Sequence, residues 1–102
     1  MAGTVQIHWY ATAWRGDQFA EALSELAPIA ARYNGERYEL LRARDDRYRF
    51  LHLIDFNDKL DFERFWQGPE LVEFRAEYSG WYQVPLQYDW YDRLREGALN
   101  SR

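Results

Sequence analysis

The sequence predicts an α+β fold in which two helices cover one face of a four-stranded antiparallel sheet. Residues 4–12 and 84–91 alternate between apolar and polar side chains, and this period of two is typical of strands. Residues 37–44 and 48–55 flank a polar turn, which predicts a hairpin. Helical apolar stripes fill the two remaining intervals. The order strand, helix, strand, strand, helix, strand is the split arrangement called ferredoxin-like.

The first helix is predicted to begin at Gly16 and Asp17. Its apolar residues recur at spacings of four and three and form one stripe: Phe19, Leu23, Leu26, Ala30 and Tyr33. Pro28 lies within this stripe and removes a helical hydrogen bond, so we expect a kink there. Asn34 and Gly35 supply a left-handed stop.

The hairpin turn is predicted at Asp45-Asp46-Arg47. Four arginines surround its two aspartates: Arg42, Arg44, Arg47 and Arg49. We interpret this group as the solvated tip of the hairpin, with a binding patch as the alternative.

The second helix has Asn57 or Asp58 as its cap. Gly68-Pro69 interrupts it, and Pro69 suits the first turn of a restarted helix that ends near Gly80. In the last strand, Val84, Leu86, Tyr88 and Trp90 share one face. Pro85 favours a position at the sheet edge, because no donor is needed there. Residues 1–92 are thus predicted to be one domain and residues 93–102 a polar, disordered tail.

The composition excludes several classes of site. The 102 residues include no cysteine, which excludes disulfides and cysteine-ligated metals. No metal-ligand motif or phosphate loop is present, so neither metal nor cofactor is expected. A net charge of −4 argues against a nucleic-acid partner, because phosphate contacts need clustered Lys and Arg.

The same sequence lacks membrane and export signals. No segment approaches the roughly 20 apolar residues of a membrane span. Residues 1–16 lack the basic region and the unbroken apolar run of a signal peptide. We therefore expect a soluble, cytoplasmic protein without a membrane partner.

Two helices on one face leave the other face of the sheet uncovered by this chain. A monomer would expose rings or aliphatic side chains from every strand there. We therefore predict a homodimer whose two sheets pack face to face.

Three segments and the aromatic last strand carry a resemblance to a known family. They are Val5-Gln6-Ile7-His8-Trp9-Tyr10, residues 47–56 and residues 61–71. Over roughly residues 5–92 the chain resembles the dimeric α/β barrel proteins, and among them the antibiotic-biosynthesis monooxygenase-like families. The resemblance implies a ferredoxin-like dimer. The superfamily includes cofactor-independent oxygenases of aromatic polyketides, polyketide cyclases, haem-degrading enzymes, isomerases and members of unknown activity.

Motifs of two branches of this superfamily can be matched to residues of this chain. Residues 82–94, with Pro85, Tyr88, Asp89 and Trp90, also resemble the end of small aromatic-polyketide cyclases. The haem-degrading branch resembles this chain at Trp66, but the position of its haem-ligating histidine is Ala76 here. Haem oxygenation is therefore not expected.

The oxygenase interpretation needs a proton acceptor, donors to a developing oxyanion and apolar walls. His52 is the first choice as acceptor, because imidazole titrates near neutral pH, and His8 is the second. The first and third strands are neighbours in this topology, so both histidines can share one face if the register permits. The alternative is that each is an ordinary surface or interface histidine.

Further site residues are predicted around a ring-lined pocket. Trp66 is expected to wall it or to donate its indole N–H, as the resemblance suggests; the alternative is plain core packing. The predicted substrate-binding residues are Asn57, Arg75, Tyr10, Tyr78 and Tyr88. A helix cap equally explains Asn57, and Arg75 equally suits an outward position.

Three functions follow: a cofactor-independent monooxygenase of an aromatic or polycyclic small molecule, a polyketide cyclase-like enzyme, or a non-catalytic dimer that binds an apolar small molecule. RNA-recognition domains share the element order, but Arg47, Arg49 and an acidic pI of about 5.1 argue against that class. A closed cavity above about 300 Å³ holding a histidine and Trp66 would favour an enzyme or a ligand binder. Rings filling that space would argue against catalysis.

Overall fold

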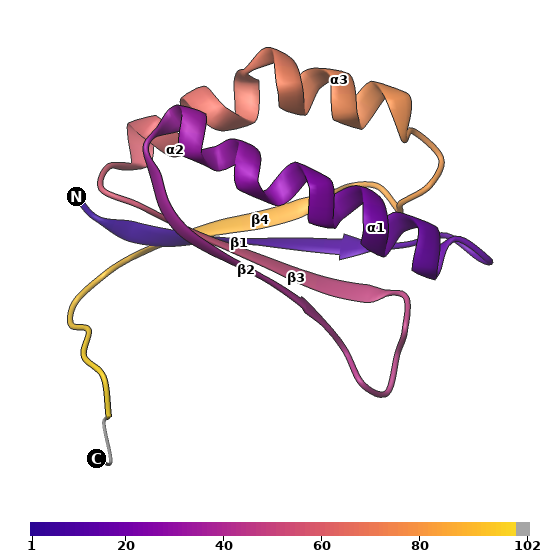
Figure 1. Cartoon of the computed structure of the whole chain (residues 1–102), viewed down its shortest axis with the longest axis horizontal. Helices are drawn as coiled ribbons and strands as arrows, with labels where there is room; N and C mark the ends of the chain where they lie inside the picture. Colours follow the sequence, from indigo (N-terminus) through magenta and orange to yellow (C-terminus); the bar gives the residue numbers. More distant parts are fainter. Residues whose placement is uncertain (100–102) are drawn as a thin grey trace.

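The computed structural model describes residues 1–99 and shows two layers, with the helices on one face of a single sheet (Figure 1). The elements are β1 (Gly3–Tyr10), α1 (Gly16–Leu26), the 3-10 helix η1 (Ala27–Tyr33), β2 (Gly35–Arg42), β3 (Arg49–Phe56), α2 (Lys59–Gln67), α3 (Pro69–Glu77) and β4 (Gln87–Asp92). The strand order is β2-β3-β1-β4 and every neighbouring pair is antiparallel. The predicted ferredoxin-like fold is confirmed.

The predicted kink at Pro28 is a change of helix type. α1 ends at Leu26, and the chain continues as η1 with Pro28 in its first turn. A 3-10 segment tolerates the missing N–H there because fewer hydrogen bonds cross the junction. Asn34 ends η1 with φ 66°, so the left-handed stop is Asn34, and Gly35 already begins β2.

The register between β1 and β3 decides which residues face the helices. Ile7 lies opposite His52, and Val5 lies opposite Ile54. Directly opposed residues share a face, so these four point toward the helices, where all are fully buried. His8 consequently points to the other face. The expectation that both histidines share one face is wrong, because it requires a register shifted by one residue.

The predicted hairpin is present, but β2 ends at Arg42 and β3 begins at Arg49, so the turn spans residues 43–48. This turn is tied to β1. Asp46 accepts hydrogen bonds from the Tyr48 backbone N–H at 3.1 Å and from the Tyr10 hydroxyl at 2.5 Å. The hydrogen bond from Tyr10 holds the pKa of Asp46 below its usual range and raises the pKa of Tyr10. Asp46 therefore holds the turn in place, although the sequence pattern indicated only a solvated tip.

The last strand is shorter than predicted. β4 begins at Gln87, so Val84 and Leu86 lie outside it, and Val84 is exposed. Pro85 has no N–H to give to a ladder, which explains why pairing starts after it. β4 is an edge strand, as Pro85 suggested.

Arg93, the first residue of the predicted tail, is attached to the sheet. Its backbone N–H donates to the Ala2 carbonyl at 2.9 Å, and its guanidinium contacts Asp55 at 2.9 Å and the Thr4 hydroxyl. The folded unit thus includes this residue. Residues 100–102 of the predicted tail lie outside the described residues.

The length and polarity of the helices decide whether any of them could span a membrane. Within residues 1–99, none is both long enough and apolar enough to cross a bilayer.

Replacement of Asp58 by alanine tests which residue caps α2. The Asp58 carboxylate accepts from the Leu60 backbone N–H at 3.0 Å, whereas the Asn57 amide donates to Glu36 at 2.7 Å. Asp58→Ala is expected to lower the free energy of unfolding by about 1 kcal/mol. Asn57→Ala, the matched control, should change it by less than about 0.5 kcal/mol. Urea unfolding measures both, and a larger loss for Asn57→Ala would contradict this assignment.

Candidate active site

His52 lies near the middle of the sheet, on the face that the helices cover. Its neighbours across the sheet are Ile7 on β1 and Leu40 on β2. Its side chain is fully buried, and burial lowers its pKa from 6.5 to about 4. The imidazole is therefore neutral at neutral pH.

The hydrogen bonds of His52 determine its tautomer. The Trp9 indole Nε1–H donates to His52 Nδ1 at 3.3 Å. A neutral imidazole has one donor and one acceptor nitrogen, so its hydrogen is on Nε2. Among residues 1–99, Nε2 has no hydrogen-bond partner. An unmet buried donor costs about 1–3 kcal/mol, so a ligand oxygen that reached Nε2 would bind with that gain.

Aromatic rings fill the space around Trp9. Its ring centroid lies 5.1 Å from that of Tyr82, 5.7 Å from Phe19 and Phe74, and 6.3 Å from Trp66. Most of these pairs are edge-to-face, the arrangement that aromatic cores favour. The five hollows described for residues 1–99 are open to the surface, and neither His52 nor His8 lines any of them.

A hollow of about 180 Å³ lies between α2 and β4. We call it the Trp66 hollow, and its lining residues are Lys59, Phe62, Glu63, Trp66, Gln67 and Tyr88. The rings of Trp66 and Tyr88 are 4.8 Å apart. Lys59 Nζ and Glu63 Oε2 lie 3.8 Å apart at its rim.

Arg75 supports Trp66 from behind. Its guanidinium lies 4.4 Å from the Trp66 ring centroid, and its Nη1 donates to the Trp66 carbonyl oxygen at 3.0 Å. Both contacts fix the indole at a junction between the buried Trp9 and the surface hollow. Arg75 thus neither points outward nor enters the hollow.

The size and lining of the Trp66 hollow limit what it can receive. An apolar cavity of roughly 150 Å³ holds one benzene ring, so this hollow accommodates a single ring of a larger ligand. Lys59 can balance the charge of a phenolate, and Glu63 can accept a proton. Through Trp66 and Trp9 the hollow is connected by contacts to His52.

The structure brings together three of the predicted site residues: Trp66, Arg75 and Tyr88. It separates the others. His8 and Tyr10 lie on the uncovered face of the sheet, and Asn57 is exposed before α2. The half-buried Tyr78 packs against Phe74 at 4.7 Å and Trp81 at 4.9 Å, at the end of α3.

Three residues of the candidate site were not predicted from the sequence. Trp9 was expected only as an alternating strand residue, because its hydrogen bond to His52 depends on the β1–β3 register. Lys59 and Glu63 lie one turn apart on α2, a spacing that marks a surface ion pair as readily as a site. The sequence signal for them was the shared helix face with Phe62 and Trp66.

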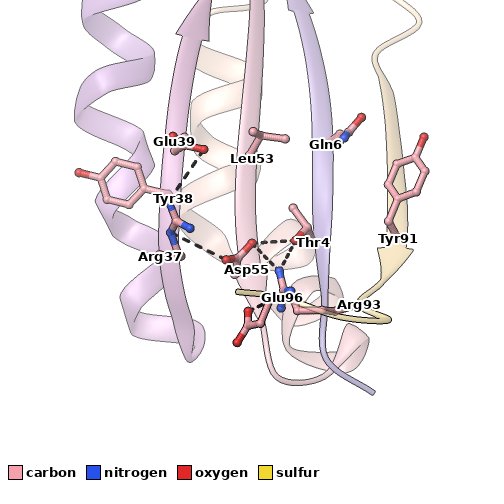
Figure 2. A pocket seen from close by; sticks show the side chains of 10 residues that line it. All are labelled: Thr4, Gln6, Arg37, Tyr38, Glu39, Leu53, Asp55, Tyr91, Arg93 and Glu96. Atoms are coloured by element: carbon pink, nitrogen blue, oxygen red, sulfur yellow. Dashed lines mark hydrogen bonds and ion pairs between the residues drawn. The ribbon is translucent and has the colours of Figure 1, made fainter. Parts of the chain in front are cut away.

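The uncovered face carries a hollow of a different character, which we call the open-face hollow (Figure 2). It measures about 410 Å³ and includes Thr4, Gln6, Leu53, Asp55, Tyr91 and Arg93 among its lining residues. Asp55 accepts from the Thr4 hydroxyl at 2.7 Å and pairs with Arg93, so its polar groups satisfy one another. None of the predicted site residues lines it.

A metal site would need several carboxylate or imidazole side chains close together. Within the described part of the chain, no three His, Asp or Glu side chains converge as a metal ion would require.

Comparisons with known proteins show what this fold resembles. No family model and no curated protein matches the chain. A proposed antibiotic biosynthesis monooxygenase from Nitrosomonas europaea superposes with a TM-score of 0.81, at 17% identity over 91% of this chain and 90% of its own. A variant of SnoaB from Streptomyces nogalater, described as a cofactor-independent oxygenase, has a TM-score of 0.78, at 16% identity over 93% and 95%.

A third structure has the same arrangement. It is a proposed antibiotic biosynthesis monooxygenase from Bordetella bronchiseptica, with a TM-score of 0.79 at 14% identity, covering 92% of this chain and 98% of its own. The similar structures therefore include the group that the sequence resembles. At identities this low, the likeness shows the fold alone.

The buried His52 predicts a pH-dependent stability. Between its folded pKa of about 4 and its ordinary value of 6.5, the unfolded chain binds more protons, so stability is full above that window and falls as the pH decreases through it. At about pH 4.5 this effect lowers the free energy of unfolding by about 2–3 kcal/mol relative to neutral pH. Chemical unfolding at several pH values measures the dependence of the unfolding free energy on pH. In His52→Leu, the decrease between pH 6.5 and about 4 that this histidine causes should vanish.

The control is His8→Leu, which removes an exposed imidazole and should keep the slope. If His52→Leu does not fold, an NMR titration of the wild-type imidazole gives the same answer. A midpoint near 6.5 for His52 would refute the buried, neutral assignment.

Proposed function

We propose that the protein is a cofactor-independent oxygenase of an aromatic small molecule. The observation that carries the proposal is the buried Nε2–H of His52, which has no partner among residues 1–99 and lies in an aromatic interior. Such a donor suits an oxygen atom on which negative charge develops. The fold shared with a protein described as a cofactor-independent oxygenase supports the same class.

His52 acts in this proposal as a hydrogen-bond donor. Its Nδ1 already accepts from Trp9, and a pKa of about 4 makes the imidazole a weak base. Proton acceptance is therefore assigned to Glu63 at the Trp66 hollow, where Lys59 balances the charge of the substrate anion.

The reaction needs no reductant if the substrate supplies both electrons. An anthrone-like ring system loses a proton from its CH₂ group, and the resulting carbanion transfers an electron to dioxygen. Recombination forms a C–O bond, and loss of water leaves a carbonyl group. The balance is one CH₂ and one O₂ converted to one C=O and one H₂O.

The proposal includes a movement of Trp66. A substrate ring bound in the Trp66 hollow is separated from His52 by the rings of Trp66 and Trp9. Trp66 is half-buried and forms one wall of the hollow, so a change of its rotamer would extend the hollow inward as far as Trp9. Trp9 would have to move as well for the substrate to reach His52. The hydrogen bond from Arg75 to the Trp66 backbone carbonyl does not depend on the rotamer, whereas the contact of the guanidinium with the indole ring would be lost.

A second candidate is a dimer that binds an aromatic ligand without catalysis. The specific observation in its favour is that rings fill the interior between sheet and helices, which is the outcome that argues against catalysis unless those rings move. A polyketide cyclase-like enzyme would use the same hollow, but it would form a carbon–carbon bond without consuming dioxygen. Product and oxygen measurements separate the three.

The homodimer is part of the proposal. The uncovered sheet face presents an apolar side chain from each strand, among which Leu41 is 45% and Tyr91 52% exposed. Leu51 and Leu53 lie between them on β3, and Tyr10 on β1 adds a ring. A second sheet would cover this face and the open-face hollow together.

Sedimentation of charge variants tests the homodimer. Leu53→Lys places an ammonium group in the proposed interface and is expected to convert a dimer to a monomer. Leu60→Lys is the control, because Leu60 is 49% exposed on the outer side of α2. A wild-type protein that sediments as a monomer, or two variants that both remain dimers, would contradict the proposed interface.

Oxygen uptake with anthrone tests the catalytic proposal. His52→Leu should reduce the rate by about a hundredfold or more, as loss of one oxyanion donor does. His52→Gln, whose amide offers an N–H near the position of Nε2, should retain more activity than His52→Leu. Glu63→Gln should also slow the reaction, whereas Glu21→Gln, an exposed glutamate of α1, should not.

The outcomes separate the candidates. A ligand-dependent rise in melting temperature with neither oxygen uptake nor product would leave the non-catalytic binder, and product without oxygen uptake would favour the cyclase. Uptake that survives His52→Leu but disappears in His8→Leu would move the site to the uncovered face and refute the proposed donor.

A further inference from the structure

Trp14 has an unusual environment for a tryptophan. Its side chain is 90% exposed, in the loop between β1 and α1. Its backbone has φ 70°, a left-handed conformation that costs a bulky residue about 1–2 kcal/mol. Nothing within the described chain covers the indole.

The loop that carries Trp14 is held in place. The Arg15 N–H donates to the Thr12 carbonyl at 3.1 Å, and the Thr12 N–H donates to the Trp81 carbonyl at 2.8 Å. The Arg15 guanidinium lies 4.5 Å from the Trp81 ring centroid. The Trp14 backbone N–H also donates to the Tyr48 hydroxyl at 3.4 Å. The exposed ring thus belongs to a loop with several fixed attachments.

A hollow of about 630 Å³ lies beside this ring, between the start of α1 and the turn end of the hairpin. We call it the Trp14 hollow, and its lining residues are Trp14, Gly16, Asp17, Gln18, Arg42, Arg47 and Tyr48. Its volume falls within the range of small-molecule sites, which is roughly 300–1,000 Å³. It shares no lining residue with the Trp66 hollow.

Gly16 allows the hairpin to approach the helix closely. A Cβ atom at this position would lie 2.9 Å from Arg42 Nη2 and 3.2 Å from the Arg47 carbonyl oxygen. Both distances are below ordinary contact, so a side chain here would displace the Arg42 guanidinium and require the Arg47 backbone to shift by a few tenths of an ångström. The shape of the hollow therefore depends on this glycine.

The charges around the hollow favour an anion. Arg42 is fixed by a hydrogen bond to the Arg47 carbonyl at 2.7 Å and an ion pair with Asp17 at 2.9 Å. Arg47 is exposed, and its guanidinium makes no ion pair with the described residues. α1 begins without a side-chain cap, and Asp17 in its first turn offsets part of the positive charge at that end, so Arg47 is the principal cation available to an anion.

We propose that the Trp14 hollow binds a small aromatic carboxylate, with its ring stacked on the Trp14 indole and its carboxylate bound by Arg47. Stacking on an exposed tryptophan ring in a loop whose backbone is held loses little conformational entropy. The planar guanidinium matches a carboxylate in a bidentate geometry. The Tyr48 hydroxyl and the first N–H groups of α1 supply further donors. This site is independent of the proposed oxygenase activity.

Titration with naphthoate tests the site, followed by tryptophan fluorescence and by the Trp14 indole resonance in NMR spectra. The neutral analogue naphthalenemethanol should bind roughly tenfold more weakly, because it cannot pair with Arg47. Trp14→Ala should raise the Kd about tenfold or more. Arg47→Gln should raise it several-fold and reduce its dependence on salt.

The controls make the same kinds of change at exposed residues outside the hollow. Arg44→Gln removes another exposed hairpin arginine that does not line the hollow, and Val84→Ala shortens another exposed apolar side chain. Neither should change the Kd.

Three results would overturn the proposal: an unchanged Kd in Trp14→Ala, equal affinity for the neutral analogue, or no shift of the Trp14 resonance at saturating naphthoate. Loss of a dimer in Trp14→Ala would overturn it as well, since a second copy would then cover the indole.

Discussion

The antiparallel pairing of β1 with β3 is the constraint on which the site depends. These strands form the middle of the sheet, and the opposition of Ile7 and His52 assigns each of their side chains to a face. The alternation of a strand leaves no intermediate choice, because a slip of one residue exchanges the two faces. The buried imidazole and the exposed His8 are consequences of this one register.

The same pairing gives His52 its chemistry. Trp9 lies diagonally across from it on β1, close enough for its indole N–H to reach Nδ1. Burial among apolar side chains removes the charge, and the indole decides which nitrogen has the hydrogen. A residue type that usually suggests a base thus becomes a neutral donor. Aromatic rings pack around Trp9 and enclose this part of the interior.

The two faces of the sheet have separate chemistry. On the covered face, polar groups are few and rings connect His52 to the Trp66 hollow. On the uncovered face, Asp55 accepts a hydrogen bond from Thr4 and forms ion pairs with Arg37 and Arg93, so segments distant in sequence meet there. The same face also presents leucines from β2 and β3. The Trp14 hollow lies at neither face but where the β1–α1 loop meets the hairpin. Each hollow depends on a different set of contacts.

The sequence by itself determined the element order, the hairpin and the fold class, because periodicity and turn residues are local properties. It also identified His52, Trp66, Arg75 and Tyr88 as residues of interest. Only the tertiary structure decided that His52 is a donor, that His8 and Tyr10 lie on the opposite face, and that Arg75 supports Trp66. Those outcomes depend on strand register and on contacts between distant segments, and residue type and spacing alone do not specify either.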